Sequence, residues 1–231
     1  MKILSVDSSA KACSAALCED GKITGSFFIN TALTHSQTLV PMIDAVLKNT
    51  NTLVESVDAF AVSAGPGSFT GVRIGVAAVK GMASALEKPC VSVSTLEAMA
   101  YNLLCEDCVA VCVMDARCSQ VYNALFRIRD GAVERLCDDR ALSIDSLAEE
   151  LKSYTDRLIL VGDGAHLCYN SFKEIIGNIE LAPENIRFQN AVGVCFAAEN
   201  KPLITAAELM PVYLRLPQAE RELKKRLENS K

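Results

Sequence analysis

The feature that most constrains the fold is an internal repeat. Each copy consists of an apolar strand that ends at an acid, a second strand, an Asp-Gly turn and a third strand. The first copy covers residues 3–29, with its acid at Asp7, and the second covers 108–133, with its acid at Asp115. Asp-Gly between two apolar runs indicates a β-hairpin. The repeat therefore predicts two similar α/β lobes, with a cleft where the strand-end acids face each other.

Elsewhere the hydrophobic pattern alternates between the helix period and short apolar runs. The clearest helix covers 36–47, and the first half is predicted as βββαβαβα. We expect one lobe over 1–105 and a second over 106–231. The other predicted elements are strands at 57–63, 90–93 and 157–161, a helix opened by Gly162-Asp163-Gly164, and helices at 70–86, 96–104, 145–154, 190–200 and 218–229, the last of them charged.

Composition narrows the class of protein. Half of the residues are hydrophobic, and 23 basic residues against 28 acidic ones give a net charge of −5. A large core is expected, and gripping nucleic acid is not expected as the main task, because phosphate binding needs a basic surface. Ten cysteines without a signal-peptide pattern indicate a reducing compartment. The longest uncharged stretch, 23–43, is too polar to span a membrane, so we expect a cytoplasmic protein.

The most unusual local sequence is the glycine-rich segment 63–73, SAGPGSFTGVR. It follows a predicted strand and opens a predicted helix, so its N–H groups could bind an anion. It lacks the lysine of a P-loop, and the spacing of Gly65, Gly67 and Gly71 is one residue too long for the dinucleotide fingerprint. A tight strand-to-helix connection is the alternative.

The helix after this loop carries two rows of small residues at steps of four, over 67–75 and 77–85. Glycine inside a helix costs about 1 kcal/mol relative to alanine, so close approach of a neighbour is the natural reason for it. That neighbour belongs either to the core of this chain or to a partner protein. For the partner alternative, the predicted contact residues are Leu39, Met42, Val46, Gly71, Val72, Gly75, Val76, Val79 and Met82.

The strand-end acids are candidate cofactor residues. Asp7, with Ser8 and Ser9, could face Asp115 and hold Mg²⁺ or its waters, and with them a weakly bound ATP or ADP. Asp115 is followed by Ala-Arg rather than by glycine, which is a poor cradle for phosphates. The alternative is that each acid only closes a turn. We expect no intrinsic cofactor beyond such a degenerate or partner-shared site.

Metal chemistry has little support in the sequence. His35 and His166 have no ligand at a metal-binding spacing, and the CxxC of Cys105 and Cys108 has no second pair to complete a zinc site. Buried thiols that behave as small apolar residues are the alternative. We therefore assign no catalytic residue and no metal ligand.

Four segments together resemble one known family. They are ILSVDSS at 3–9, HSQTLVP at 35–41, SAGPGSFTGVRIG at 63–75 and PVYLR at 211–215. Along essentially the whole chain they are similar to the bacterial TsaB (YeaZ) family of tRNA threonylcarbamoyladenosine biosynthesis proteins. The resemblance implies two ribonuclease-H-like lobes, as in the actin-like ATPases and sugar kinases.

The resemblance also implies that catalysis has been lost. The related catalytic protein TsaD carries a His-x-x-x-His metal pair after the corresponding strand, and the flanking residues align its two positions with Thr95 and Met99. Neither residue suits a hard cation as an imidazole would, and Glu97 alone cannot replace the pair. The chain is thus expected to be a non-catalytic activator.

The implied partners follow from the same resemblance. The chain would pair with TsaD through the helices of its first lobe, the small ATPase TsaE would dock where the two meet, and tRNA would be held mainly by the complex. Without its partner, the same face could form a homodimer. Two other functions stay open: a nucleotide-dependent phosphotransferase of this fold, motivated by the paired acids, and, with least support, a peptidase.

Overall fold

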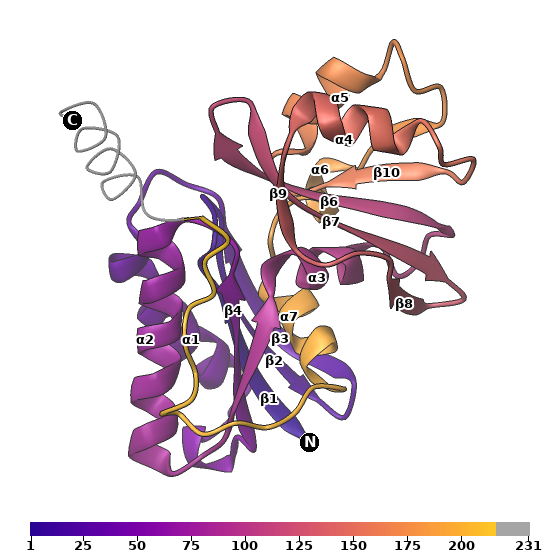
Figure 1. Cartoon of the computed structure of the whole chain (residues 1–231). Coiled ribbons are helices and arrows are strands. Elements are labelled where there is room, and N and C mark those ends of the chain that lie inside the picture. Colours follow the sequence, from indigo (N-terminus) through magenta and orange to yellow (C-terminus); the bar gives the residue numbers. More distant parts are fainter. Residues whose placement is uncertain (216–231) are drawn as a thin grey trace, which may run out of the picture.

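The computed structural model describes residues 1–215 as two α/β lobes (Figure 1). The first lobe contains a five-stranded sheet of order β3-β2-β1-β4-β5, and the second a sheet of order β11-β10-β6-β7-β8, with β9 paired to β7. In each sheet three antiparallel strands are followed by two parallel ones. This is the ribonuclease-H-like plan, so the predicted fold is confirmed. The helix expected at 218–229 lies outside the described residues.

The first lobe comes from the N-terminal part of the chain. Its elements are β1 (Lys2–Asp7), β2 (Cys13–Glu19), β3 (Lys22–Ile29), α1 (His35–Asn49), a 3-10 turn (Val54–Ser56), β4 (Ala59–Gly65), α2 (Phe69–Leu86), β5 (Cys90–Ser94), α3 (Thr95–Ala100) and a second 3-10 turn (Tyr101–Leu103). The helix expected over 96–104 thus loses its α-helical form after Ala100.

The second lobe contains shorter elements. They are β6 (Cys108–Arg117), β7 (Gln120–Arg129), β8 (Ala132–Arg135), β9 (Arg140–Ser143), α4 (Ile144–Leu151), β10 (Leu158–Val161), α5 (Ala165–Phe172), β11 (Ile179–Leu181), α6 (Glu184–Arg187) and α7 (Ala191–Ala198). Three of them, β9, β11 and α6, have no more than four residues and were not predicted.

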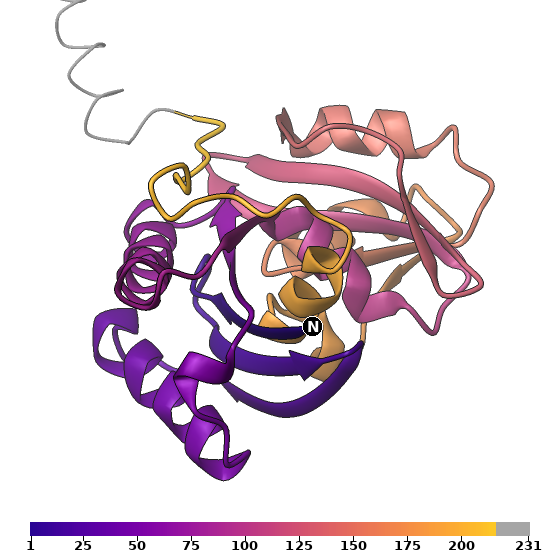
Figure 2. The same cartoon turned by 90° about the horizontal axis from the view of Figure 1, so that it is seen from below.

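Helices α1 and α2 pack side by side against the first sheet (Figures 1 and 2). The Ser68 side chain caps α2 by accepting from the Gly71 N–H, and Glu87 ends it in the left-handed conformation. Within residues 1–215, α2 is the single helix long and apolar enough to cross a membrane. Its apolar face, however, packs on β4 within the lobe core.

The end of the described chain returns to the first lobe. Helix α7 packs against β1 and β2, where the Ser5 hydroxyl donates to the Ala191 carbonyl (2.7 Å). Farther along, Ile204 bridges to Cys90, and the Val212 N–H donates to the Ala64 carbonyl (2.7 Å). We call residues 203–215 the strap (Figure 1). The division at 105/106 stays a prediction, and the core of the first lobe includes residues from beyond it.

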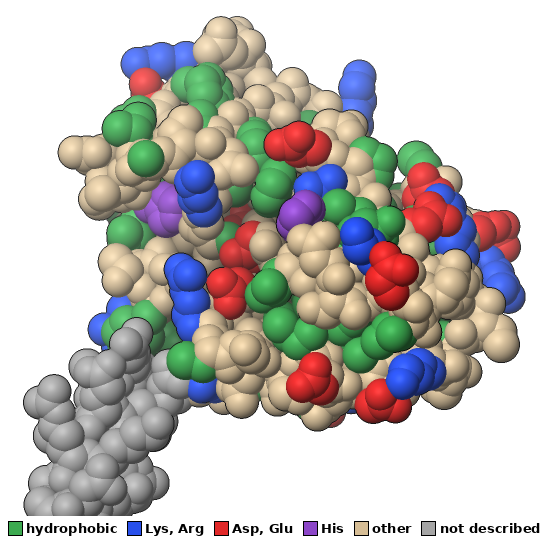
Figure 3. All heavy atoms as spheres, turned by 90° about the horizontal axis from the view of Figure 1, so that it is seen from above, with side chains coloured by type: hydrophobic (Ala, Val, Ile, Leu, Met, Phe, Trp, Pro, Cys, Tyr) green, Lys and Arg blue, Asp and Glu red, His purple; other side chains and the backbone are tan. Residues whose placement is uncertain are grey.

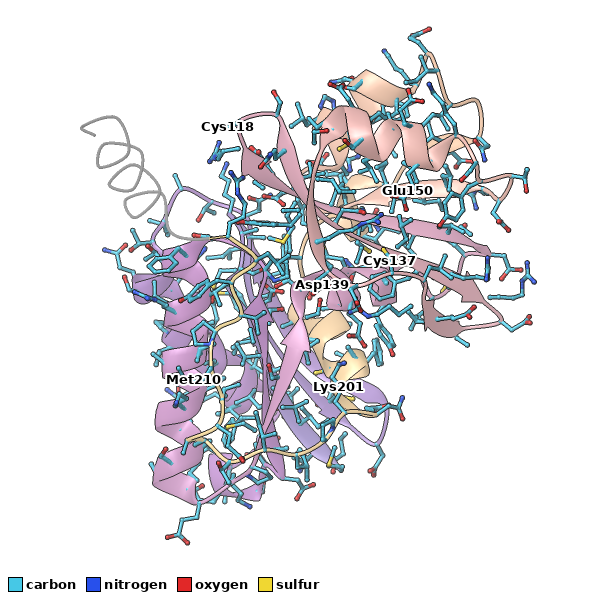
Figure 4. All side chains as sticks on the ribbon, in the orientation of Figure 1. Cys118, Cys137, Asp139, Glu150, Lys201 and Met210 are labelled. Atoms are coloured by element: carbon cyan, nitrogen blue, oxygen red, sulfur yellow. The ribbon has the colours of Figure 1, made fainter. Side chains whose placement is uncertain are left out.

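A cluster of charged side chains joins the two lobes. Arg135 of β8 donates to Glu97 of α3 (3.1 Å) and to Asp139 (2.6 Å), and Lys201 pairs with Glu97 (2.9 Å). Figure 4 shows Asp139 and Lys201 near the junction of the lobes, well away from Cys118 at the tip of the β6–β7 hairpin. These partly buried pairs are screened less than surface pairs, so they hold the lobes in one relative orientation.

Candidate functional site

A cleft with a volume of about 500 Å³ lies between the lobes. Figure 3 looks toward this hollow, where acidic side chains lie deep and basic side chains follow one rim. Five segments form its wall: the loop after β1, the loop before α2, the end of β6 with its hairpin, the loop after β10, and the strap. The lining residues are Ser9, Ala10, Lys11, Pro66, Gly67, Ser68, Phe69, Met114, Asp115, Ala116, Arg117, Tyr122, Asp163, Val212, Tyr213, Leu214 and Arg215.

Asp7 lies beneath this cleft and does not line it. Its side chain is buried, and it accepts hydrogen bonds from the Ser9 N–H (2.9 Å), the Ser9 hydroxyl (2.7 Å) and the Ser63 hydroxyl (2.5 Å). Burial raises the pKa of Asp7, although these three hydrogen bonds oppose the shift. The carboxylate therefore holds the loop after β1 in place.

Of the four predicted cofactor residues, only Ser9 and Asp115 line the cleft. Ser8 is buried and its hydroxyl donates to the Gly71 carbonyl (2.8 Å), so it points into the first lobe. Asp115 is one-third exposed and accepts from the Arg117 N–H (2.7 Å). The structure thus separates the paired acids instead of turning both toward a shared ligand.

Asp163 is the acid that accompanies Asp115 at the floor of the cleft. It follows β10, and its carboxylate accepts from the Gln189 side chain (2.8 Å). Burial raises the pKa of Asp163, and the nearby charge of Asp115 adds to the rise. In the sequence, Gly162-Asp163-Gly164 indicated a turn, and only the sheet order shows that β10 ends beside β6.

The glycine-rich segment is a tight connection. A methyl group at Gly67 would lie 2.4 Å from the Ser9 carbonyl oxygen, and one at Gly71 would lie 2.1 Å from that of Ser8. Glycine is needed because the loop after β1 and the first turn of α2 press together. The Ser68 N–H donates to the Ser9 carbonyl (2.6 Å). That N–H is therefore not free for an anion, so the connection alternative is favoured.

These residues do not fit the phosphates of ATP or ADP. The Ser9 carbonyl occupies one N–H at the start of α2, and Asp7 has its hydrogen bonds filled within the lobe. In the second lobe a tight hairpin with positive φ angles at Arg117, Cys118 and Ser119 stands where a glycine loop would be needed.

The two positions aligned with the metal pair of TsaD are packed inside the protein. Thr95 and Met99 are both fully buried, and a methyl group at Gly162 would lie 2.9 Å from the Met99 sulfur. No group of three or more His, Cys, Asp or Glu side chains within residues 1–215 is arranged to hold a metal ion. His35 instead contacts the Ala10 carbonyl (2.7 Å), and His166 lies beside Asn170 (3.2 Å).

The predicted partner residues lie on the inner faces of α1 and α2. All of them except Met82 are buried, and the side chains pack in the core of the first lobe. As contacts of a partner they are therefore wrong, because hydrophobic burial against β1 and β4 already uses them. The outer faces carry exposed residues at neighbouring positions, among them Val40, Ala77 and Gly81.

Comparison with known proteins places this two-lobed cleft in a family. Residues 29–222 match the family described as "TsaD: tRNA N6-adenosine threonylcarbamoyltransferase". A "tRNA threonylcarbamoyladenosine biosynthesis protein TsaB" from Haemophilus influenzae is 32% identical over 93% of this chain and 94% of its own length. The chain belongs to the TsaB family.

Other TsaB proteins agree. The Bacillus subtilis TsaB is 28% identical over 95% of this chain and 96% of its own length. The crystal structure titled "YeaZ from Pseudomonas aeruginosa" superposes with a TM-score of 0.78 at 25% identity, covering 92% of this chain and 99% of that one. As a TsaB protein, the chain has a role in the biosynthesis of tRNA threonylcarbamoyladenosine.

Proposed function

We propose that the chain is the non-catalytic subunit that pairs with the transferase TsaD and activates it for threonylcarbamoyl transfer to tRNA. The observation that carries this proposal is the packing of Thr95 and Met99. Both lie in the interior, where the Met99 sulfur fills the space beside Gly162. A metal pair placed there would require room and ligands that the packed core does not offer.

The outer face of α1 and α2 supports the pairing. Val40 is 60% exposed on α1, and Ala77, Gly81 and Ala85 form an exposed row along α2. A methyl group at Gly81 would meet no atom within 4 Å. Small exposed residues on an apolar helix let a partner helix approach closely, so we place the TsaD contact on this outer face. A homodimer in isolation would use the same face.

The other parts of the proposal rest on the family. TsaE would dock where the two subunits meet, and no tightly bound nucleotide is expected in the cleft of this chain. Ten free cysteines and a role in tRNA modification support a cytoplasmic location.

Pairing can be tested with two glycines that differ only in their place. Gly81→Arg puts a long cation on the outer face of α2, whereas Gly177→Arg puts the same side chain on an exposed turn of the second lobe. Neither position has an atom within 4 Å of the added Cβ. With co-expressed TsaD, we expect Gly81→Arg to weaken the pair at least tenfold, measured by sizing chromatography and titration.

The matched control decides the outcome. Gly177→Arg should pair like the wild type, and both variants should melt within a few degrees of it. Equal pairing by both variants would reject the α1–α2 face. Separate elution of the wild-type chain and TsaD would reject the proposed function itself, as would full tRNA modification by TsaD without this chain.

A further inference from the structure

The basic residues of this acidic protein are used differently at the cleft and elsewhere. In the second lobe, Arg140 pairs with Glu150 (2.7 Å), and Arg157 pairs with Glu106 (2.6 Å) and Glu180 (2.8 Å). At the cleft rim, Lys11 is exposed and forms no ion pair with any residue in the range 1–215. Positive charge is therefore neutralised away from the cleft and left available at its rim.

Two arginines complete this rim. The Arg117 side chain is 83% exposed at the hairpin tip, and its distance to Asp115 is 3.5 Å, which is a weak contact. Arg215 of the strap donates to the Ala116 carbonyl (2.9 Å), which sets its guanidinium beside the hairpin. Lys11, Arg117 and Arg215 come from three separate segments and line one cavity. We call them the rim cations.

Aromatic side chains lie next to the rim cations. The rings of Phe69 and Tyr213 are 4.8 Å apart at 32°, and the Arg73 guanidinium lies 3.7 Å from the centre of the Phe69 ring. Arg73 also donates to the Tyr213 hydroxyl (2.8 Å), so the aromatic pair is held rigidly. Tyr213 is nevertheless 39% exposed. A fixed, exposed aromatic ring beside cations is the combination that stacks bases and binds phosphates in single-stranded nucleic acid.

The floor of the cleft determines which phosphate ligand fits. Asp115 and Asp163 lie there, so a triphosphate that entered deeply would meet carboxylates, and the start of α2 offers the Ser9 carbonyl at this point. Phosphates are therefore favoured at the rim. A phosphodiester chain that crosses the mouth of the cleft meets this condition, whereas a nucleotide inserted between the lobes does not.

We propose that the rim cations and the Tyr213 ring bind a single-stranded segment of the tRNA substrate across the mouth of the interlobe cleft. This contact rests on the proposed function, in which the chain works as a subunit of a tRNA-modifying pair. It gives the chain a direct role in holding RNA and explains how a protein with a net charge of −5 can contribute to that task.

The test uses a fluorescein-labelled tRNA anticodon stem-loop and anisotropy titration over a range of salt concentrations. The full chain is measured alone and in its pair with TsaD. The double variant Lys11→Ala, Arg117→Ala is compared with Lys22→Ala, Arg129→Ala, which removes the same charge at exposed hairpin positions far from the cleft. Both double variants should keep the wild-type melting temperature.

We expect the rim double variant to bind the RNA about tenfold more weakly. Its plot of log K against log salt should become shallower by about 1.4, because each lost phosphate contact on a single strand removes about 0.7. Tyr213→Leu should weaken binding by about tenfold without changing this slope, since stacking releases no counterions. The control double variant should match the wild type.

Three outcomes would overturn the inference. The rim double variant could bind like its control, or neither the wild-type chain nor the pair could bind the stem-loop. Alternatively, MgATP or MgADP could displace the RNA and lose its own binding, measured by calorimetry, in the rim double variant, which would assign the cleft to a free nucleotide. Failure of the chain to elute with TsaD would instead count against the proposed function, and the RNA titration of the chain alone would still decide the rim contact.

Discussion

Asp7 and Asp115 stand at matching places in the internal repeat, yet they have different surroundings. Strand β1 ends at Asp7, and the following loop folds back so that the carboxylate is buried and accepts three hydrogen bonds. Strand β6 runs past Asp115 into a tight hairpin, and that carboxylate remains one-third exposed. The same residue type in the same sheet position therefore organises a loop in one lobe and faces the cleft in the other.

The difference arises in the segment that follows each acid. After Asp7, Ser8 and Ser9 bring their carbonyls against Gly71 and Gly67 of the glycine-rich segment. After Asp115, the chain reverses through residues with positive φ angles, and Arg117 reaches the cleft rim. A repeated sheet can thus carry two unlike ends, because the strand pairing is decided by hydrophobic pattern and the ends by local turns.

The largest effect should come from removing the two acids in turn. Asp7→Ala leaves the Ser9 N–H and the hydroxyls of Ser9 and Ser63 buried without an acceptor, so we expect a loss of about 3–5 kcal/mol in the free energy of unfolding. Asp115→Ala removes a partly exposed hydrogen bond and should lose less than about 1 kcal/mol. Urea denaturation measures both. Similar losses for the two variants would show that the acids are equivalent after all.

A smaller effect is expected where glycines press on the segment after each acid. A methyl group at Gly71 would lie 2.1 Å from the Ser8 carbonyl, whereas one at Gly164 would lie 3.0 Å from the Asp115 nitrogen. We expect Gly71→Ala to lose about 2–3 kcal/mol by overpacking and Gly164→Ala about 1 kcal/mol. Gly177→Ala, in open space, is the control for thermal melting. A larger loss at Gly164 than at Gly71 would reverse the comparison.

The smallest effect is a pH dependence of the buried acid. The pKa of Asp7 in the folded protein is raised above 3.8 by burial, so protonation favours the folded state. Its stabilising contribution is complete below about pH 3.8 and is lost as the pH rises through the folded-state pKa. The wild type should therefore lose stability relative to Asp7→Asn over this rise. Urea curves at several pH values test this, and parallel pH profiles would contradict it.

Much of the fold could be predicted because its signals are local. The hairpins of both lobes, α1 and α2 follow from periodicity and Asp-Gly turns, and their observed bounds differ from the predicted ones by a few residues. The strands β9 and β11 have four and three residues, too short for a periodic pattern.

The candidate site was harder to predict for two reasons. The buried state of Asp7 depends on Ser63, which lies 56 residues away, and the place of Asp163 depends on which strand lies beside β6. The inner and outer faces of α2 are both rich in small or apolar residues, so the pattern could not show which face the sheet covers. Arg117 and the PVYLR segment were visible as residues, but their meeting at one cleft follows only from the tertiary fold.

The strap and α7 have a consequence for synthesis on the ribosome. Ser5 contacts Ala191, and Leu209 is fully buried among the residues of the first core. The part of the protein that leaves the ribosome first thus cannot be completed until nearly the whole chain has been translated. Contacts this far apart in sequence slow folding, and until they form, β1 and β2 leave apolar surface uncovered. Nascent chains that stop before residue 191 should therefore be good clients for chaperones.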